Sequence, residues 1–130
     1  MILGLGCDIV NVQRIEKSAD FLTRFKQKIL GNDELKELEQ RRIDNERELA
    51  CVLAKYYAGK EAFAKALGSG FIDGIFLKDI QVLHDELGKP HLSVRGNAAA
   101  YLQKMSKTAH LHISLSDDYP SAQAVVIIED

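Results

Sequence analysis

One long helical pattern restricts the fold of this chain more than any other feature. It runs from about residue 46 to residue 67 and is followed by glycines at positions 68, 70 and 74. At about 100° per residue, the larger apolar side chains gather on one broad stripe. The stripe holds Leu49, Val52, Leu53, Tyr56, Phe63, Ala64 and Leu67. Such a helix has to bury this stripe against a second layer of structure.

Charged residues interrupt the stripe. Lys60 falls in its middle, so it has to snorkel, find a buried partner, or face a cavity or another subunit. Glu61 falls at the edge, in a row that also carries Ala54 and Gly68, where small side chains leave space for something to approach. Lys65 lies one turn further on. Alone, Glu61 and Lys65 are typical of a solvated helix flank.

The rest of the chain predicts short strands and helices. Residues 2 to 10 read as a strand, and Asp20 is a plausible N-cap for a helix that stops at Gly31. The remaining expected elements are a helix from about 33, a hairpin of 80–84 and 91–94, a short helix opened by Gly96, and closing strands at 110–116 and 122–129. We therefore expect an α+β fold, a single domain over residues 1–130, with a mainly antiparallel sheet packed against one long helix.

Composition excludes several classes of protein. The 130 residues carry a formal charge of -2, which gives no reason to expect a nucleic-acid binder. Cys7 and Cys51 are too few and too far apart for a disulfide framework or a metal knuckle. The N-terminal stretch has no basic region and contains Asp8, and no apolar run is long enough to cross a bilayer. We expect a cytoplasmic protein with no membrane partner.

Asp8 and Glu61 together suggest a metal site. Asp8 shares a strand face with Gly4 and Gly6, which leave it almost bare, and Glu61 lies at the edge of a packed helix. Mg²⁺ takes one or two protein carboxylates and completes its shell with waters and phosphate oxygens. Lys65 would then face the phosphate.

The loop after the long helix is a weaker candidate for phosphate binding. The backbone N–H groups of Gly68, Ser69 and Gly70 can approach a ligand closely, because glycine has no side chain. A glycine C-cap, however, explains Gly68 without any ligand.

Three stretches are similar to one known family: GLGCDIVNVQRIEK at the start, YYAGKEAFAKALGSG in the middle and HISLSD near the end. With the ELGKP turn, they resemble the holo-acyl-carrier-protein synthase family of phosphopantetheinyl transferases. The resemblance implies transfer of the 4′-phosphopantetheine arm of coenzyme A to a serine of an apo acyl carrier protein, in support of fatty acid biosynthesis. Adenosine 3′,5′-bisphosphate is the expected second product, and Mg²⁺ the expected cofactor.

The resemblance also implies residue roles. Asp8 and Glu61 match the family's magnesium ligands, and Lys65 matches the lysine that contacts the diphosphate. These three residues are the expected catalytic group. His112 resembles a residue of the coenzyme-binding region, to which Lys65, Gly68, Ser69 and Gly70 are also assigned. Either His112 or a metal-linked water takes the proton of the serine, and the sequence does not choose between them.

Partner binding is expected on a basic strip over residues 12–28, on an otherwise acidic protein. By family match, Arg14 and Arg24 are the candidates for contact with an acidic carrier protein. The family forms homotrimers with active sites at subunit interfaces, which offers an explanation for Lys60. One departure is Tyr56, where relatives commonly have an arginine that helps hold a phosphate of the coenzyme.

The sequence is also compatible with two other kinds of protein. GLGCD is also compatible with the phosphate loop of an actin-like or sugar-kinase fold, although the chain is far too short for two lobes. A non-catalytic oligomeric binding module would use the basic strip for docking, with Asp8 and Glu61 as buried structural carboxylates. Binding of magnesium together with coenzyme A distinguishes the enzyme from both.

Overall fold

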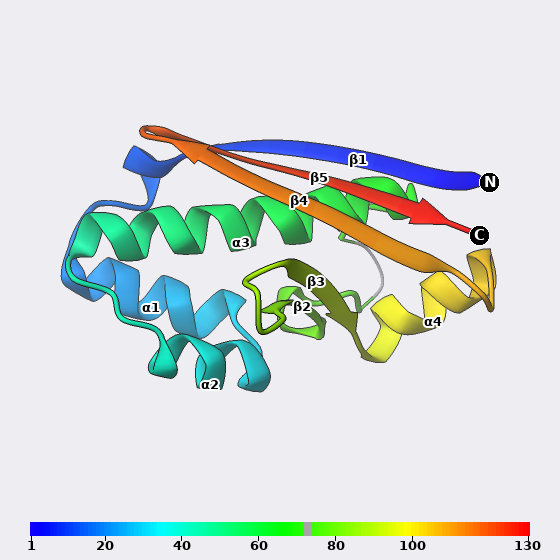
Figure 1. Ribbon diagram of the computed structural model, residues 1–130, viewed down its shortest axis with the longest axis horizontal. Helices are drawn as coiled ribbons and strands as arrows, with labels where there is room; N and C mark the ends of the chain where they lie inside the picture. The colour runs from blue at the N-terminus through cyan, green and yellow to red at the C-terminus, as the bar shows by residue number, and fades with distance from the viewer. Residues whose placement is uncertain (72–73) are drawn as a thin grey trace.

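The computed structural model describes residues 1–71 and 74–130, and it has the expected α+β fold (Figure 1). The strands are β1 (Ile2–Asn11), β2 (Ile80–His84), β3 (Pro90–Val94), β4 (His110–Asp118) and β5 (Ser121–Glu129). The α-helices are α1 (Ala19–Ile29), α2 (Asn32–Gln40), α3 (Glu46–Leu67) and α4 (Gly96–Met105). Two 3₁₀ turns, η1 (Val12–Arg14) and η2 (Leu77–Asp79), complete the order. Each expected helix and strand is present.

An antiparallel sheet of three strands, in the order β1-β5-β4, forms one layer of the molecule. The long helix α3 runs beneath this sheet, and α1, α2 and the β2–β3 hairpin lie on the other side of α3 (Figure 1). The inward residues of β5 are buried throughout: Ala122, Ala124, Val126 and Ile128. The predicted packing of an antiparallel sheet against one long helix is therefore confirmed.

Glycines let β1 approach α3 at backbone distance. A Cβ added at Gly4 would lie 2.1 Å from the carbonyl oxygen of Ala66, and one at Gly6 would lie 1.8 Å from that of Ala62. No side chain fits at these distances. The expectation that this bare strand face leaves space for a ligand was wrong at Gly4 and Gly6, because the helix backbone fills the space.

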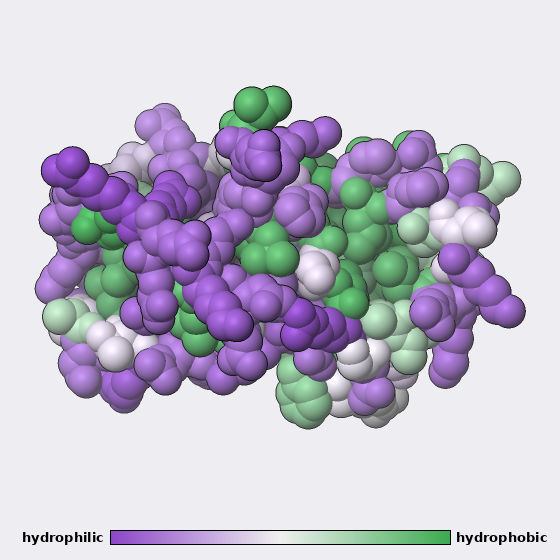
Figure 2. Space-filling view, turned by 60° about the horizontal axis from the view of Figure 1, so that its bottom comes forward, coloured by the Kyte–Doolittle hydropathy of each residue, from purple (hydrophilic) through white to green (hydrophobic). Residues whose placement is uncertain are grey.

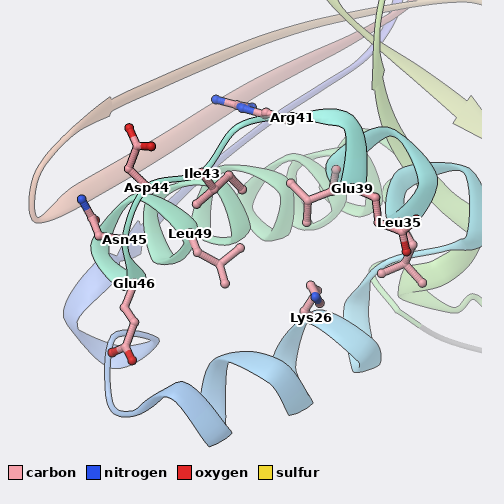
Figure 3. Close-up of a pocket in the computed structure, with 10 residues that line it drawn as sticks. Lys26, Leu35, Glu39, Arg41, Ile43, Asp44, Asn45, Glu46 and Leu49 are labelled. Carbon is pink, nitrogen blue, oxygen red and sulfur yellow. The ribbon is translucent and has the colours of Figure 1, made fainter.

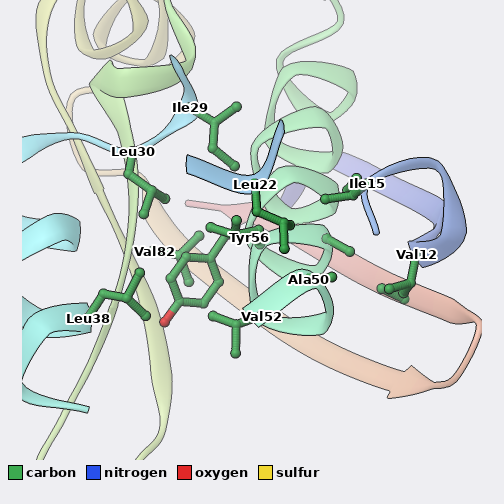
Figure 4. Packing of buried hydrophobic residues seen from close by; sticks show 13 residues of the cluster. Val12, Ile15, Leu22, Ile29, Leu30, Leu38, Ala50, Val52, Tyr56 and Val82 are labelled. Carbon is green, nitrogen blue, oxygen red and sulfur yellow. The ribbon is translucent and has the colours of Figure 1, made fainter. Parts of the chain in front are cut away.

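The core surrounds α3 on both sides. One buried cluster joins η1, α1, α2 and the first half of α3, and Tyr56 lies within it beside Val52 and Val82 (Figure 4). A second cluster, around Phe63 and Val126, lies between the other half of α3 and the sheet. The predicted stripe is largely buried, with Leu49 and Leu67 only partly covered.

Lys60, which interrupts the apolar stripe of α3, has a buried partner in the same chain. Its side chain is fully buried, and Nζ lies 2.6 Å from Glu34 Oε1 on α2. A neighbouring subunit is therefore not the explanation for this lysine.

The ends of two helices differ from expectation. The N-cap of α1 is Ser18, whose Oγ accepts a hydrogen bond from the N–H of Phe21, while Asp20 lies in the first turn. Gly31 is the N-cap of α2, and α1 already ends at Ile29. In the described parts of the chain, no helix is long and apolar enough to span a membrane.

The sheet face turned away from α3 exposes apolar side chains. Leu5 keeps 64% and Ile9 keeps 68% of its surface exposed, and Cys7 between them is also exposed. Strand alternation places these side chains opposite Gly6 and Asp8, which face the helix. The strand β1 thus presents an apolar face on one side and a polar, close-packed face on the other.

Candidate functional site

Asp8 and Lys65 meet where β1 crosses the end of α3. Nζ of Lys65 donates to Oδ1 of Asp8 at 3.1 Å and to the carbonyl oxygen of Cys7 at 3.0 Å. The side chain of Asp8 is only 18% exposed, whereas that of Lys65 is 55% exposed. The lysine is therefore placed to meet a ligand from solvent while it stays next to the carboxylate.

Glu61 joins this group through Tyr57, which lies one turn earlier on α3. Burial first, then a hydrogen bond with Glu61 and the negative charges of Glu61 and Asp8, raise the pKa of Tyr57 to about 12. The Tyr57 hydroxyl therefore lies near the carboxylates of both Glu61 and Asp8. Asp8 pairs with Lys65, and Tyr57 lies near both Glu61 and Asp8, so the three residues lie in one region of the structure. Their catalytic roles stay a prediction.

The donor set suits magnesium. Asp8 and Glu61 offer hard carboxylate oxygens from two rigid elements, a strand and a helix. Among the described residues, no group of three or more His, Cys, Asp or Glu side chains is placed to hold an ion. Two carboxylates are too few to hold a metal ion by themselves. They suit a magnesium ion that takes its other ligands from water and from a phosphate-bearing ligand.

The loop Gly68-Ser69-Gly70 does not offer its glycine N–H groups to a ligand. The N–H of Gly68 donates to the carbonyl of Lys65 at 3.0 Å, and that of Gly70 donates to Ala64 at 3.2 Å. Gly68 has φ of 80°, the left-handed conformation of a glycine C-cap. Both N–H groups close the end of α3 in this structure, and the assignment of Gly68, Ser69 and Gly70 to coenzyme binding stays a prediction.

An open pocket of about 560 Å³ adjoins Glu61. Most of its lining is apolar, and two lysines lie at its margin. The lining residues are Lys28, Glu61, Phe71, Ile75, Phe76, Leu77 and Lys78. Phe76 is 64% exposed, so its ring is open to a ligand in the pocket.

A second pocket, of about 370 Å³, lies between α1, α2 and the start of α3 (Figure 3). Leu35, Ile43 and Leu49 line it, with Lys26 entering from α1. None of the residues expected to act in catalysis lines this pocket.

Comparison with known proteins decides the family. The model of the 4′-phosphopantetheinyl transferase superfamily matches residues 4–124. This chain belongs to that superfamily. A holo-[acyl-carrier-protein] synthase of Brucella ovis is 39% identical, over 99% of this chain and 96% of the relative.

Solved structures of this transferase superfamily have the same fold. The holo-[acyl-carrier-protein] synthase of Neisseria meningitidis matches with a TM-score of 0.81 and 34% identity, over 100% of both chains. A holo-(acyl-carrier-protein) synthase of Bacillus anthracis, solved in complex with CoA (3′,5′-ADP), matches with a TM-score of 0.76 and 30% identity. That match covers 98% of this chain and 96% of the other.

His112 lies apart from the site within one transferase chain. It pairs with Ile127 of β5, which pairs with Leu5 of β1, so these three side chains share the outer face of the sheet. Asp8 faces α3 on the opposite side. His112 Nε2 lies 3.0 Å from Oε1 of Glu129, a partner on the same outer face. One chain alone therefore does not bring His112 to Asp8.

The basic strip of the transferase lies on η1 and α1, and its charged side chains are mostly exposed. Arg14 and Arg24 are both exposed, and Arg24 pairs with Asp20 at 3.2 Å in solvent. The side of the molecule that carries α1 and α2 is mostly hydrophilic (Figure 2). Exposed pairs of this kind exchange partners readily, because they contribute little to stability.

Aromatic rings connect this strip to the site. Phe21 and Phe25 stack at 6.0 Å along α1, and Phe25 lies 5.5 Å from the ring of Tyr57. Tyr57 in turn lies beside Glu61. A chain of ring contacts thus runs from α1 to the residue beside Glu61.

Tyr56, at the position where relatives commonly carry arginine, is buried in the core and 2% exposed. Its ring lies 5.7 Å from that of His84, and burial raises its pKa to about 12 while the guanidinium of Arg41 lowers it. Tyr56, Arg41 and His84 line a further pocket of about 720 Å³. Arg41 thus places a positive charge beside Tyr56.

Sequence reasoning missed two residues of the site region. Tyr57 lies four residues before Glu61, a spacing at which helical side chains meet, so the signal for this contact was present. Glu34, the partner of Lys60, lies in a charged helix that reads as solvated. No local pattern distinguishes it from its exposed neighbours.

Proposed function

We propose that this protein transfers the 4′-phosphopantetheine arm of coenzyme A to a serine of an apo acyl carrier protein, in support of fatty acid biosynthesis. The observation that carries the proposal is the cluster of Asp8, Glu61 and Lys65 in a chain that matches the family over residues 4–124. We further propose that residues 1–130 act as one transferase domain in the cytoplasm.

The chemistry is a displacement at phosphorus. The serine oxygen forms a bond to the phosphorus that carries the pantetheine arm, and the bond from that phosphorus to the bridging oxygen breaks. Adenosine 3′,5′-bisphosphate leaves with the electron pair, and the proton of the serine hydroxyl passes to a base, either a water beside the carboxylates or His112 of another chain. Lys65 stabilises the negative charge that develops on this leaving group, as a preorganised cation beside the reacting phosphate.

Asp8 and Glu61 would hold the magnesium ion, which supplies further neutralisation of the diphosphate when bound. The Tyr57 hydroxyl, which lies near Glu61, would orient this carboxylate through a hydrogen bond. His112 serves a coenzyme site only if a second chain presents it, since its own chain places it on the outer face of the sheet.

A homotrimer with sites at subunit interfaces accounts for the exposed apolar face of the sheet. Leu5 and Ile9 are 64% and 68% exposed on the same face of β1, and an assembly that packs on this face would cover them. The same assembly offers a way for His112 of one chain to approach the coenzyme bound to another.

The carrier protein is proposed to dock on η1 and α1. Its acidic surface suits Arg14 and Arg24, which would speed encounter more than they tighten the complex. Arg24→Glu should raise the KM for the carrier protein roughly tenfold and weaken the salt dependence of the rate, while the KM for coenzyme A stays unchanged.

The direct test is intact-mass spectrometry of an apo carrier protein after incubation with this protein, coenzyme A and Mg²⁺. A gain equal to one phosphopantetheine that disappears on chelation supports the reaction and the metal. Asp8→Ala and Glu61→Ala should each reduce the rate by roughly a hundredfold or more, whereas Asp118→Ala, at an exposed carboxylate, should not. Full activity in both site variants would refute the metal assignment.

A further inference from the structure

Lys60 is a fully buried ammonium group with every proton in use. Nζ donates to Glu34 Oε1 at 2.6 Å, to the carbonyl oxygen of Leu77 at 3.1 Å and to that of Ile80 at 2.5 Å. An ammonium group has three donors, so these three acceptors satisfy it completely. Leu77 is the first residue of the η2 turn and Ile80 is its C-cap, so Lys60 contacts the turn at both ends.

Glu34 extends the same network into α2 and β2. Its Oε1 accepts from the N–H of Gly31 at 2.9 Å, and its Oε2 accepts from the N–H of Val82 at 2.9 Å. Burial raises the pKa of Glu34 and lowers that of Lys60, and attraction between the two opposes both shifts. One ion pair thus fixes three elements against α3.

The turn that Lys60 holds is a wall of the pocket beside Glu61. Leu77 and Lys78 of η2, with Phe76 before them, line this pocket, and Glu61 lines it from α3. Lys60 and Glu61 are consecutive residues and so point about 100° apart on the helix. One turn of α3 therefore carries the Glu61 carboxylate, which lines the pocket, and Lys60, which fixes the position of the η2 wall.

We infer that Lys60 is a positioning residue, which holds the η2 wall so that the pocket beside Glu61 takes the pantetheine arm of coenzyme A. This inference rests on the proposed function. The arm starts at the phosphate that Asp8, Glu61 and Lys65 would hold, and it consists of uncharged amide, hydroxyl and hydrocarbon groups. A largely apolar pocket at Glu61 suits this arm and not the charged bisphosphate half of the coenzyme.

The test uses a pair of ligands that differ by the arm. Coenzyme A and adenosine 3′,5′-bisphosphate share the nucleotide half, and only coenzyme A carries the arm. The double variant Glu34→Leu with Lys60→Met removes both buried charges at once and puts apolar side chains of similar size in their place, so no unpaired charge is left in the core. Circular dichroism and molar mass check the fold and assembly before binding is measured by calorimetry with Mg²⁺.

The double variant should bind coenzyme A roughly tenfold more weakly and bind the bisphosphate within about twofold of the wild type. The KM for the carrier protein should not change. An equal loss for both ligands, no loss for either, or a variant that does not fold would assign the pair a structural role only and overturn the inference.

Phe76→Ala tests the pocket without disturbing the ion pair. Phe76 is 64% exposed, so its removal should leave stability nearly unchanged. It should weaken coenzyme A binding several-fold and spare the bisphosphate, and equal effects on the two ligands would exclude the arm from this pocket. Wild-type protein that binds neither ligand would instead contradict the proposed function, and the inference with it.

Discussion

Replacing Gly6 with alanine should push β1 away from α3. The new Cβ would lie 1.8 Å from the carbonyl oxygen of Ala62 and 2.8 Å from the backbone N of Ala66. Both contacts are backbone atoms of a helix, which have no rotamer to change. The strand and the helix would have to separate by roughly 1 Å to reach the shortest contact that real side chains show.

The free energy of unfolding should fall by about 3 kcal/mol, at the upper end of the range for overpacked sites. For a chain of this size, such a loss lowers the midpoint of thermal unfolding by about 10 °C. The movement also carries Asp8 away from Lys65, which lies 3.1 Å from it. Transferase activity should therefore fall more steeply than the folded fraction at the assay temperature.

Gly59→Ala is the matched control on α3. A Cβ at Gly59 would meet Ile113 Cδ1 at 3.0 Å, the far end of a flexible side chain, and alanine favours the middle of a helix. Urea unfolding of the two variants should place Gly59→Ala within about 1 kcal/mol of the wild type. If Gly6→Ala is equally stable and fully active, the close approach of strand and helix is not what requires glycine.

Three further outcomes are expected. Tyr57→Phe removes the hydroxyl beside Glu61 and should raise the Mg²⁺ concentration for half-maximal rate several-fold. The melting temperature should change by no more than about 2 °C. An unchanged metal requirement would show that Tyr57 plays no part in the site. Ile9→Glu should convert the proposed homotrimer to folded monomers and reduce activity. Light scattering measures the molar mass, and an unchanged mass would place the interface elsewhere. Hydrogen bonds from the backbone lower the pKa of Asp85, so the hairpin gains stability from the ionised form above the normal aspartate pKa and loses it as the pH falls through the lowered value. The protection of the Lys89 amide, which donates to Asp85, should fall on acidification once its exchange rate is divided by the intrinsic rate at the same pH, and Asp85→Asn should remove this pH dependence of the protection.

The sequence predicted the elements well because their signals are local. The bounds of α3 follow from Asn45, which caps its N-terminus, and from Gly68, which ends it. The first cap of α1 was misassigned because Ser18 and Asp20 are both good N-cap residues within two positions of each other, and composition alone does not rank them.

The site was predictable where it rests on one helix and one strand, and less so where it depends on long-range contacts. Asp8 meets Lys65 because β1 packs on α3, a contact that follows from the predicted layer of sheet on helix. The pairing of Lys60 with Glu34 joins residues from two helices, and no periodicity indicates it. The position of His112 on the outer face of the sheet could have been predicted, since alternation along β4 places it on the opposite face from Leu111 and Ile113.

Strand β1 is constrained on both of its faces. One face admits only glycine where it meets α3, and it holds Asp8; the other presents Leu5 and Ile9. A scan of all substitutions, scored by growth of cells that depend on this protein, should therefore find few neutral changes along β1. The exposed tip of the β2–β3 hairpin, where Leu87 is 95% exposed, should accept many. Natural drift in this protein should accordingly be slow in its first ten residues and fast at that tip.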